Sequence, residues 1–403
     1  MTERLAQFKT YRHALLNLSA LSLRSRAPAC ESRCLRWASR STSLLTLLGQ
    51  TFSVRLEFPL IIFICLLLVC GLVALSSAAT PTDFQKQLMG VALALIPMTV
   101  VWRLGRKRLH NVAPWLYALA LLLLLMTALF GREVNGNRNW LSLGPLQLQP
   151  VEIAKLGLVL MLAWTMKTGY QGPRSYIVPF SVFGTVFGLV VTHDFGDAMV
   201  LAVIFLSTLL TFKVPAFHLA LVLLSLAVLF PTVVLPHLKP YQQARLTSFI
   251  DPTKDARGSG YQVAQAMIAE GSGGFEGKGY RKGTQIHKGF VYSQQSDFIF
   301  AAWAEEQGFV GCIGLMVLFI GLLWRMASIT SGLPGLQDQL VVTGVMAWIG
   351  AQVVENIGAS ISMLPLTGIT LPLISYGLTS LIMILTALAC VIVIQRDRNL
   401  DKI

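Results

Sequence analysis

The sequence predicts an all-α integral membrane protein with about ten transmembrane helices. Of its 403 residues, 54% are hydrophobic and 13% are charged, and the mean hydropathy is +0.65. This composition is too apolar for a soluble domain of this size. Stretches of roughly 20 apolar residues, the length that crosses a bilayer core, recur along the chain. The expected spans are about 58–77, 85–102, 112–130, 150–167, 175–192, 196–212, 216–236, 298–324, 339–361 and 369–394.

The net charge of +13 follows the predicted connections. Clustered Lys and Arg keep short connections on the cytoplasmic side, and here they occupy every second connection. They are Arg4, Lys9, Arg12, Arg24, Arg26, Arg33, Arg36, Arg40 and Arg55, then Arg103, Arg106, Lys107, Arg108, Lys167, Arg174, Lys213 and Arg325, then Arg396, Arg398 and Lys402. We therefore expect both termini in the cytoplasm, and we assign the positive charge to topology and lipid contact rather than to nucleic-acid binding.

Three parts follow from this topology. Residues 1–57 form a basic cytoplasmic extension that is expected to be disordered, 58–395 form the membrane domain, and 396–403 form a cytoplasmic tail. A bacterial plasma membrane is the expected location. The Arg- and Ser-rich extension also resembles an organelle transit peptide, which leaves an organelle membrane of cyanobacterial origin as a minor alternative. A further alternative is that the true start codon lies downstream of Met1, so that part of this extension is not translated.

The connection 237–297, between the seventh and eighth spans, is by far the longest on the outer side. Long loops without a domain of their own are usually functional. Ala264, Met267 and Ile268 at i, i+3, i+4 spacing predict a short helix that ends at the glycines of 271–274. We expect this helix to lie on the membrane surface with its apolar stripe toward the lipid.

Asp297 stands where this loop enters the eighth span, and two roles are open for it. Ser and Asp are favoured at helix N-caps, so Asp297 could cap the span. Alternatively, its place at the bilayer boundary beside Phe298 and Phe300 predicts partial desolvation, which raises the pKa of a carboxyl group. Such a group suits a general base that takes a proton from a hydroxyl. Gln262 and Lys278, among the glycines of the same loop, are candidate ligand-binding residues.

Ionisable residues at membrane depth are a second indication of a site. A charge at a helix centre costs about 2.5–3.5 kcal/mol on insertion scales, so such groups tend to face a cavity or a partner. Glu152 and Lys155 are three residues apart on the fourth span, where they could neutralise each other and also line a site. Asp194 and Asp197 flank the boundary of the fifth and sixth spans.

A third indication is the polar sequence that interrupts the last two spans. Gln352, Asn356 and Ser375 lie near Pro365 and Pro372. Irregular backbone at membrane depth is tolerated only where protein or a water-filled cavity covers it. This pattern predicts a cavity wall, as in transporters with broken helices, so transport is a rival to catalysis.

Ordered motifs over about residues 58–395 resemble the SEDS family of shape, elongation, division and sporulation proteins (RodA, FtsW, SpoVE). The motifs are Asn139-Trp140-Leu141, Gln149-Pro150-Val151-Glu152, Ala154-Lys155, Arg245, Phe249, Asp251-Pro252, Asp255, Gly258-Ser-Gly260-Tyr261-Gln262, Gly271-Ser-Gly-Gly274, Gly277-Lys-Gly279, Asp297-Phe-Ile-Phe300, Ala304-Glu305-Glu306, Pro365-Leu-Thr-Gly368 and Leu371-Pro372 with Ser375-Tyr376-Gly377. Gly283-Thr284-Gln285 is more similar to RodA and Gly258-Ser-Gly260 to FtsW, and we favour RodA.

The resemblance implies a peptidoglycan glycosyltransferase that polymerises lipid II outside the plasma membrane, for cell shape or division. It implies a class B penicillin-binding protein as partner, and it makes Asp297 the essential aspartate of the family. We expect Arg245 to bind the departing diphosphate of the undecaprenyl-linked glycan, helped by Lys155 or a divalent cation (Mg²⁺ or Mn²⁺). No protein-bound metal site and no certain cofactor are predicted. A lipid II flippase and a non-catalytic scaffold remain alternatives.

Overall fold

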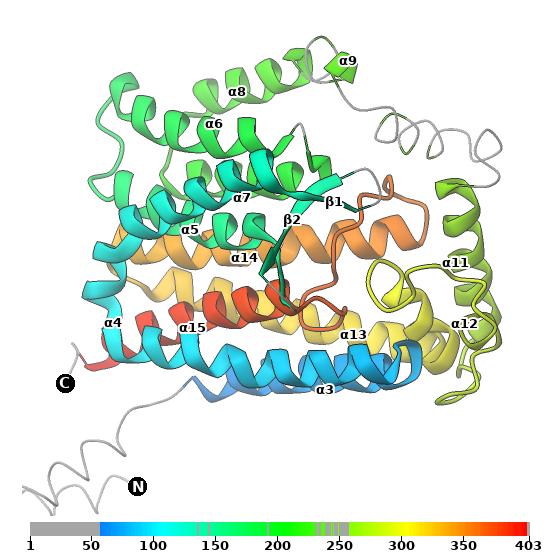
Figure 1. Ribbon diagram of the computed structural model, residues 1–403. Helices are drawn as coiled ribbons and strands as arrows, with labels where there is room; N and C mark the ends of the chain where they lie inside the picture. The colour runs from blue at the N-terminus through cyan, green and yellow to red at the C-terminus, as the bar shows by residue number, and fades with distance from the viewer. Residues whose placement is uncertain are drawn as a thin grey trace, which may run out of the picture. The chain divides into compact units, whose positions relative to one another are not determined.

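The computed structural model describes residues 57–400, apart from 135–136, 144–145, 192, 230–231, 233–234, 238–242, 244, 246–248 and 250–257. Of the predicted extension 1–57, everything but Glu57 lies outside the described residues, as do 401–403. The described helices are α3 Phe58–Ala78, α4 Pro81–Phe130, α5 Pro150–Thr165, η1 Pro173–Tyr176, α6 Ile177–Val191, α7 Phe195–Thr211, α8 Ala216–Leu229, α9 Leu235–His237, α11 Ser259–Gly273, α12 Thr284–His287, α13 Ile299–Gly332, α14 Leu336–Ser360 and α15 Leu378–Leu400 (Figure 1).

The predicted helical membrane fold is confirmed. Six helices of the described part are long and apolar enough to cross a membrane, namely α3, α4, η1 with α6, α13, α14 and α15, and α7 and α8 are shorter apolar helices. Nine of the ten predicted spans fall wholly or largely on one of these helices, and the fourth, 150–167, falls on α5. Large apolar side chains such as Trp115 and Trp324 are exposed on the outside of the bundle, as lipid contact requires.

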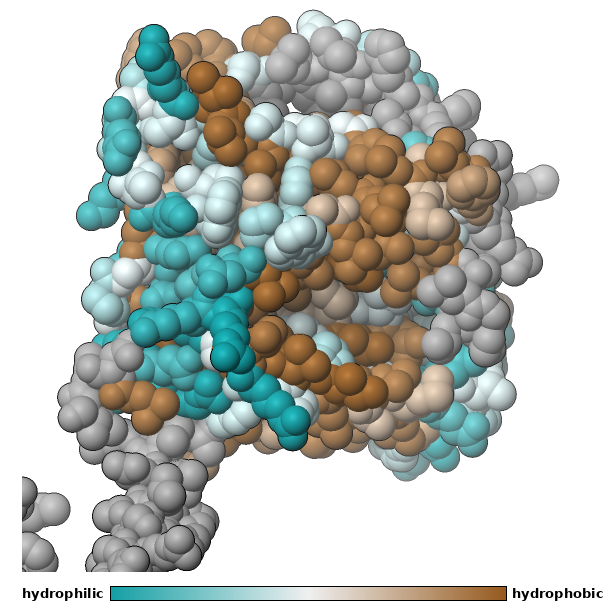
Figure 2. Space-filling view, turned by 60° about the vertical axis from the view of Figure 1, so that its left-hand side comes forward, coloured by the Kyte–Doolittle hydropathy of each residue, from teal (hydrophilic) through white to brown (hydrophobic). Residues whose placement is uncertain are grey.

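Helix α4 contains two predicted spans, 85–102 and 112–130, as two helices that meet at a kink inside the predicted connection 103–108. The connection is a break of helical geometry at one residue rather than a loop. The helix bends at Gly105, where φ is +69°, a conformation that glycine adopts without steric cost. Beyond the bend, the backbone N–H of Arg106 donates to the Asp397 carboxylate at 2.7 Å. Figure 2 shows hydrophilic residues gathered at the end of the bundle where α4 bends, beside broad hydrophobic surface.

Two other predicted boundaries are corrected. The outer connection 78–84 shrinks to Ala79 and Thr80, because Pro81 starts α4 at a position where proline is favoured. The last span begins at Leu378 rather than at 369, since 369–377 is irregular and held by side-chain hydrogen bonds described below. At its other end α15 continues to Leu400, so the first residues of the predicted tail are helical.

A small antiparallel sheet in the outer connection 131–149 was not predicted. It consists of β1 Arg132–Val134, β2 Asn137–Leu143 and β3 Leu146–Leu148, in the order β1-β2-β3. Its strands are too short for a clear alternation of apolar and polar residues. The sheet lies against α15, where the Thr379 hydroxyl donates to the Gln147 carbonyl at 3.3 Å.

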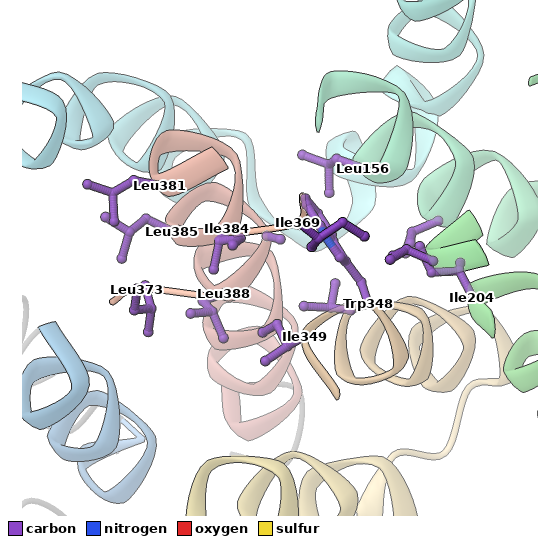
Figure 3. Close-up of a cluster of buried hydrophobic side chains, with 14 of the residues drawn as sticks. Leu156, Ile204, Trp348, Ile349, Ile369, Leu373, Leu381, Ile384, Leu385 and Leu388 are labelled. Atoms are coloured by element: carbon purple, nitrogen blue, oxygen red, sulfur yellow. The ribbon is translucent and has the colours of Figure 1, made fainter. Parts of the chain in front are cut away.

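The centre of the bundle is formed by α14 and α15. Of their most apolar windows, 67% and 83% of residues are buried, against 33% or less in α3, α4 and α13. Figure 3 shows Trp348 and Ile349 of α14 beside Leu156 of α5, Ile204 of α7, and Leu381, Ile384, Leu385 and Leu388 of α15. Polar side chains on α14 are therefore enclosed by other helices rather than by lipid.

Candidate active site

The loop before α13 is held against the irregular segment 361–377 by two side chains. The Asn356 amide donates to the carbonyl of Asp297 at 2.9 Å and to that of Ile369 at 2.8 Å. The Ser375 hydroxyl donates to the Ser296 carbonyl at 2.6 Å. Both side chains were predicted to bind substrate, but their contacts are with the backbone on either side of the site. They fix the position of Asp297.

Asp297 is not the N-cap of α13. The helix begins at Ile299, its N-cap is Phe298, and no side chain caps it. Burial raises the pKa of Asp297, while a hydrogen bond from Ser296 and the positive charge of Arg245 oppose this rise. A partly desolvated carboxylate next to a cation is what a general base at this position requires.

Arg245 and Asp297 both lie beside Gly368. The Arg245 Nη1 donates to the carbonyl of Thr367 at 2.8 Å. A Cβ atom added at Gly368 would stand 3.5 Å from Arg245 Nη1 and 3.8 Å from Asp297 Oδ2. Gly368 has a φ of +84°, which side chains other than glycine's rarely adopt, so no side chain of its own stands beside the guanidinium and the carboxylate.

An apolar cavity of about 70 Å³ opens beside Arg245. It lies between α11 and the residues before Thr367. Its other lining residues are Phe249, Gly260, Val263, Ala264, Met267, Ser362, Leu364 and Leu366. A guanidinium at the edge of an apolar cavity fits an amphiphile whose anionic group is next to its hydrocarbon.

The predicted helix of the outer loop is α11, and it ends at Gly274 as expected, with φ of +58°. It packs on α13 through Ala266, Ala269 and Gly273, and a Cβ at Gly273 would lie 2.1 Å from the Ala304 carbonyl. Met267 and Ile268 remain exposed on the other side. Gln262 is partly buried on this helix, but its side chain makes no hydrogen bond within the described residues.

A buried charge cluster lies inside the bundle. Lys155 Nζ is 2.9 Å from Glu152 Oε1 and 2.7 Å from Asp197 Oδ1, and all three side chains are buried. The predicted pairing of Glu152 with Lys155 is confirmed, and Asp197 of α7 joins it. The sequence analysis assigned Asp197 no role, although a carboxylate in the first turn of an apolar helix gave the same signal as Glu152.

Asp194 stands one turn before this cluster and connects α7 to the sheet. It caps α7 by accepting from the Asp197 N–H at 3.1 Å, and the Asn139 amide donates to it at 2.5 Å. Burial, followed by the charge of Asp197, raises the pKa of Asp194. Asp194 therefore positions the outer end of α7 and, through α7, Asp197.

Lys278 has a role in holding the loop. Its Nζ lies 2.6 Å from Glu305 Oε1 and donates to the hydroxyls of Ser272 and Thr284 at 2.7 Å each. Glu305 in turn accepts from two backbone N–H groups, those of Gln285 and Ile286. This network connects the outer loop to α13, and the positive charge of Lys278 is paired with Glu305.

No group of three or more His, Cys, Asp or Glu side chains in the described part of the chain could hold a metal ion. The buried cluster around Lys155 carries two carboxylates of its own.

Comparison with known proteins places the chain in a family. The model of the cell cycle protein family FtsW/RodA/SpoVE matches residues 48–400. A probable peptidoglycan glycosyltransferase FtsW from Thioalkalivibrio sp. (strain K90mix) is 33% identical over 366 residues, which cover 85% of this chain and 90% of the relative. The peptidoglycan glycosyltransferase MrdB of Escherichia coli (strain K12) is 30% identical over 345 residues, which cover 85% of this chain and 93% of MrdB.

Two solved structures are similar over 85% of this chain and 98% of their own. The rod shape determining protein RodA of Thermus thermophilus superimposes with a TM-score of 0.66 at 33% identity. A chain from a peptidoglycan synthase complex, studied for its coordination of polymerization and crosslinking, superimposes with a TM-score of 0.75 at 36% identity. The sequence resemblance is thus confirmed, and the chain belongs to the FtsW/RodA/SpoVE family of cell cycle proteins.

Proposed function

We propose that this chain is a peptidoglycan glycosyltransferase that polymerises lipid II into glycan strands on the outer face of a bacterial plasma membrane. Its relatives FtsW and MrdB are named peptidoglycan glycosyltransferases. The observation that carries the proposal is that Asp297 and Arg245 both lie beside Gly368, with an apolar cavity next to Arg245. The reaction needs a base for the hydroxyl of the acceptor, a cation for the diphosphate of the donor and a place for the donor's hydrocarbon.

In the proposed reaction, the 4-hydroxyl of one lipid II attacks the anomeric carbon of an undecaprenyl-diphosphate-linked strand. A new glycosidic C–O bond forms, and the bond from the anomeric carbon to the diphosphate oxygen breaks. Asp297 accepts the hydroxyl proton, and Arg245 stabilises the negative charge that develops on the departing diphosphate. The cavity beside Arg245 would hold the first part of a prenyl chain and so orient the diphosphate.

The buried cluster has a supporting part in this proposal. Lys155 is bound by two carboxylates, so its charge is not available to bind a diphosphate directly. Instead, the cluster joins α5 to α7 and sets the floor under segment 361–377. Gln352 faces this interior, whereas Gln262 is left as a candidate for sugar contact at the outer surface.

A class B penicillin-binding protein is the proposed partner, and both termini are proposed to lie in the cytoplasm. The partner proposal is supported by the similarity to a chain of a complex that coordinates polymerization and crosslinking. The chain could act as RodA or as FtsW, and the role of RodA stays our prediction. The relatives include both kinds of protein.

Two alternatives are separable from the enzyme. A flippase would use the Lys155 cluster for transport and would need no general base on the outer side. A scaffold would need surface contacts and no buried acids at all. Asp297, held by Asn356 and Ser375 beside Arg245, favours the enzyme over both.

Asp297→Asn tests the proposal directly. The amide keeps the size of the side chain but cannot accept a proton, so glycan synthesis should fall by about 10²-fold or more. The measurement is glycan length on a gel, from purified protein and labelled lipid II with and without the transpeptidase partner. Since Asp297 is not a helix cap, folded yield should stay at the wild-type level. Normal glycan chains from the folded variant would remove Asp297 from the mechanism.

A further inference from the structure

Helix α14 presents a polar stripe to the buried charge cluster. Trp348, Gln352 and Glu355 follow each other at i, i+4 and i+7 and are at most 5% exposed. Trp348 Nε1, both polar side-chain atoms of Gln352 and Oε1 of Glu355 have no hydrogen-bond partner within the described protein. The Lys155 ammonium lies 5.7 Å from the centre of the Trp348 ring, which puts this stripe against the cluster.

The charges around Glu355 do not balance if Glu355 is ionised. Lys155 already pairs with both Glu152 and Asp197, so the cluster holds one positive and two negative charges. Glu355 interacts electrostatically with Asp197 and Lys155, and no ion pair in the described part of the chain joins it to a cation. A third buried carboxylate would be uncompensated, which is strongly unfavourable. This arrangement holds only with an uncharged Glu355.

Glu355 reaches the candidate active site through one residue. Its carboxyl hydrogen-bonds with the side chain of Thr367, whose carbonyl accepts from Arg245. The next residue is Gly368, which lies beside both Arg245 and Asp297. Thr367 also packs on α7, since a Cβ at Gly196 would meet the Thr367 Cβ at 2.6 Å. A shift of Thr367 would therefore move both sides of the site.

We propose that Glu355 is a positioning residue of the polymerase, whose uncharged carboxyl holds Thr367 and thereby fixes Arg245 relative to Asp297. The inference rests on the proposed function. When Glu355 ionises, repulsion from Asp197 displaces the Glu355 carboxylate together with its hydrogen-bond partner Thr367, or draws Lys155 away from Asp197. In either case the site loses its alignment, so polymerisation falls as the pH rises through the ionisation of Glu355.

Other titratable groups could shape the same pH profile. Those nearest to Glu355 are Glu152 and Lys155 on α5, Asp194 and Asp197 at α7, Arg245 and Asp297 at the site, and Glu270 of α11, which contacts α14 at Ser360. Asp297 as a base produces a fall at low pH, not at high pH. Burial raises the pKa of Glu270 to about 7, so Glu270→Gln is the matched control for an alkaline fall.

The test compares the pH dependence of polymerisation of labelled lipid II by wild type, Glu355→Gln, Glu355→Ala and Glu270→Gln. Glutamine keeps the neutral, hydrogen-bonding form, so Glu355→Gln should stay within a few-fold of wild type at the optimum and lose the alkaline fall. Glu355→Ala leaves Thr367 unsupported, and kcat should drop by up to about 10²-fold, with a smaller change in KM. Glu270→Gln should keep the wild-type profile.

A wild-type profile without an alkaline fall, or a Glu355→Gln profile that retains it, would overturn the proposal. Infrared spectra give a readout that does not depend on activity. The difference between wild type and Glu355→Gln at neutral pH should contain the C=O stretch of a protonated carboxyl group, and carboxylate bands in its place would also overturn the proposal. Absence of glycan from wild type at every pH counts against the proposed function, and the infrared result then decides on Glu355 alone.

Discussion

At the scale of single residues, the candidate site depends on how side chains are oriented by backbone carbonyls. Asn356 and Ser375 donate hydrogen bonds to the carbonyls of Asp297 and Ser296, so the backbone of the proposed general base is held by two side chains. Arg245 is fixed in the same way by Thr367. The reacting groups are therefore placed by the irregular segment 361–377, and small changes in that segment should affect catalysis.

Arg245 gives the first prediction at this scale. Arg245→Ala should lower polymerisation strongly, because no other side chain of the site replaces its contact with a diphosphate. Arg245→Lys should recover only part, since a guanidinium binds two phosphate oxygens at once and an ammonium cannot. Initial rates with labelled lipid II measure both. Wild-type rates from both folded variants would show that Arg245 is not a phosphate ligand.

The rate of polymerisation at low pH gives the second prediction at this scale. A base must be deprotonated, so polymerisation should fall as the pH drops through the pKa of Asp297, and burial moves that fall above the range of an ordinary aspartate. The Ser296 hydroxyl opposes the rise of the pKa. Ser296→Ala should therefore shift the acid limb of kcat/KM to higher pH, while Ser331→Ala, exposed on α13, should leave it in place. If the acid limb of Ser296→Ala stays at the same pH or moves to lower pH, Asp297 is not the general base.

At the scale of elements, the bends in the long helices are stabilised by residues far away in the sequence. The bend in α4 at Gly105 exposes the N–H of Arg106, which Asp397 of α15 accepts. Arg106 and His110 of α4 also contact Asp338 of α14 at 3.3 and 2.8 Å. The end of the bundle where α4 bends is thus closed by hydrogen bonds and ion pairs among three helices.

Substitution of Asp397 tests whether these contacts between helices stabilise the bend in α4. Asp397→Ala removes the cap of the second half of α4 and should cost about 1 kcal/mol, the typical value of a lost helix cap. Asp397→Asn should keep most of this stability, because Asn is a comparable cap. Thermal unfolding in detergent measures the difference. Equal melting temperatures for Asp397→Ala and wild type would show that the bend needs no cap from α15.

At the scale of the whole molecule, the arrangement of polar residues on opposite ends of the bundle predicts an outer and a cytoplasmic surface. The loop with Lys288 and the bend with Lys107 belong to opposite ends, and both side chains are exposed. Gly283, by contrast, is unsuitable for labelling, since a Cβ there would lie 2.8 Å from a Glu305 carboxylate oxygen.

A cysteine at Lys288, in a variant without its six native cysteines, should react with an impermeant thiol reagent added to intact cells. A cysteine at Lys107 should react only after the cells are opened. The positive-inside distribution of Lys and Arg is the physical reason. Labelling in the reverse order would place the candidate site in the cytoplasm and contradict the proposed function.

Much of this architecture was predictable from the sequence. The spans follow from uninterrupted apolar runs, and the candidate residues Asp297, Lys155 and Glu152 stand out because charges are costly near a membrane. Arg245 was expected from the family resemblance and the reaction that it implies. The end of α11 was predictable because its glycines act locally. By contrast, the sequence placed the last span too early, because apolar residues 369–374 are irregular rather than helical.

What the sequence by itself determined is therefore the helical membrane fold, its spans and the candidate residues, since each depends on local composition and spacing. Only the tertiary structure decided which of these residues meet. In the folded chain, Asp197 pairs with Lys155, and Lys278 pairs with Glu305. Asp297 is not the cap of α13, and Glu355 lies beside Thr367. The physical reason is that these contacts join residues distant in the chain, and a side chain's burial and partners are fixed only once the helices have packed.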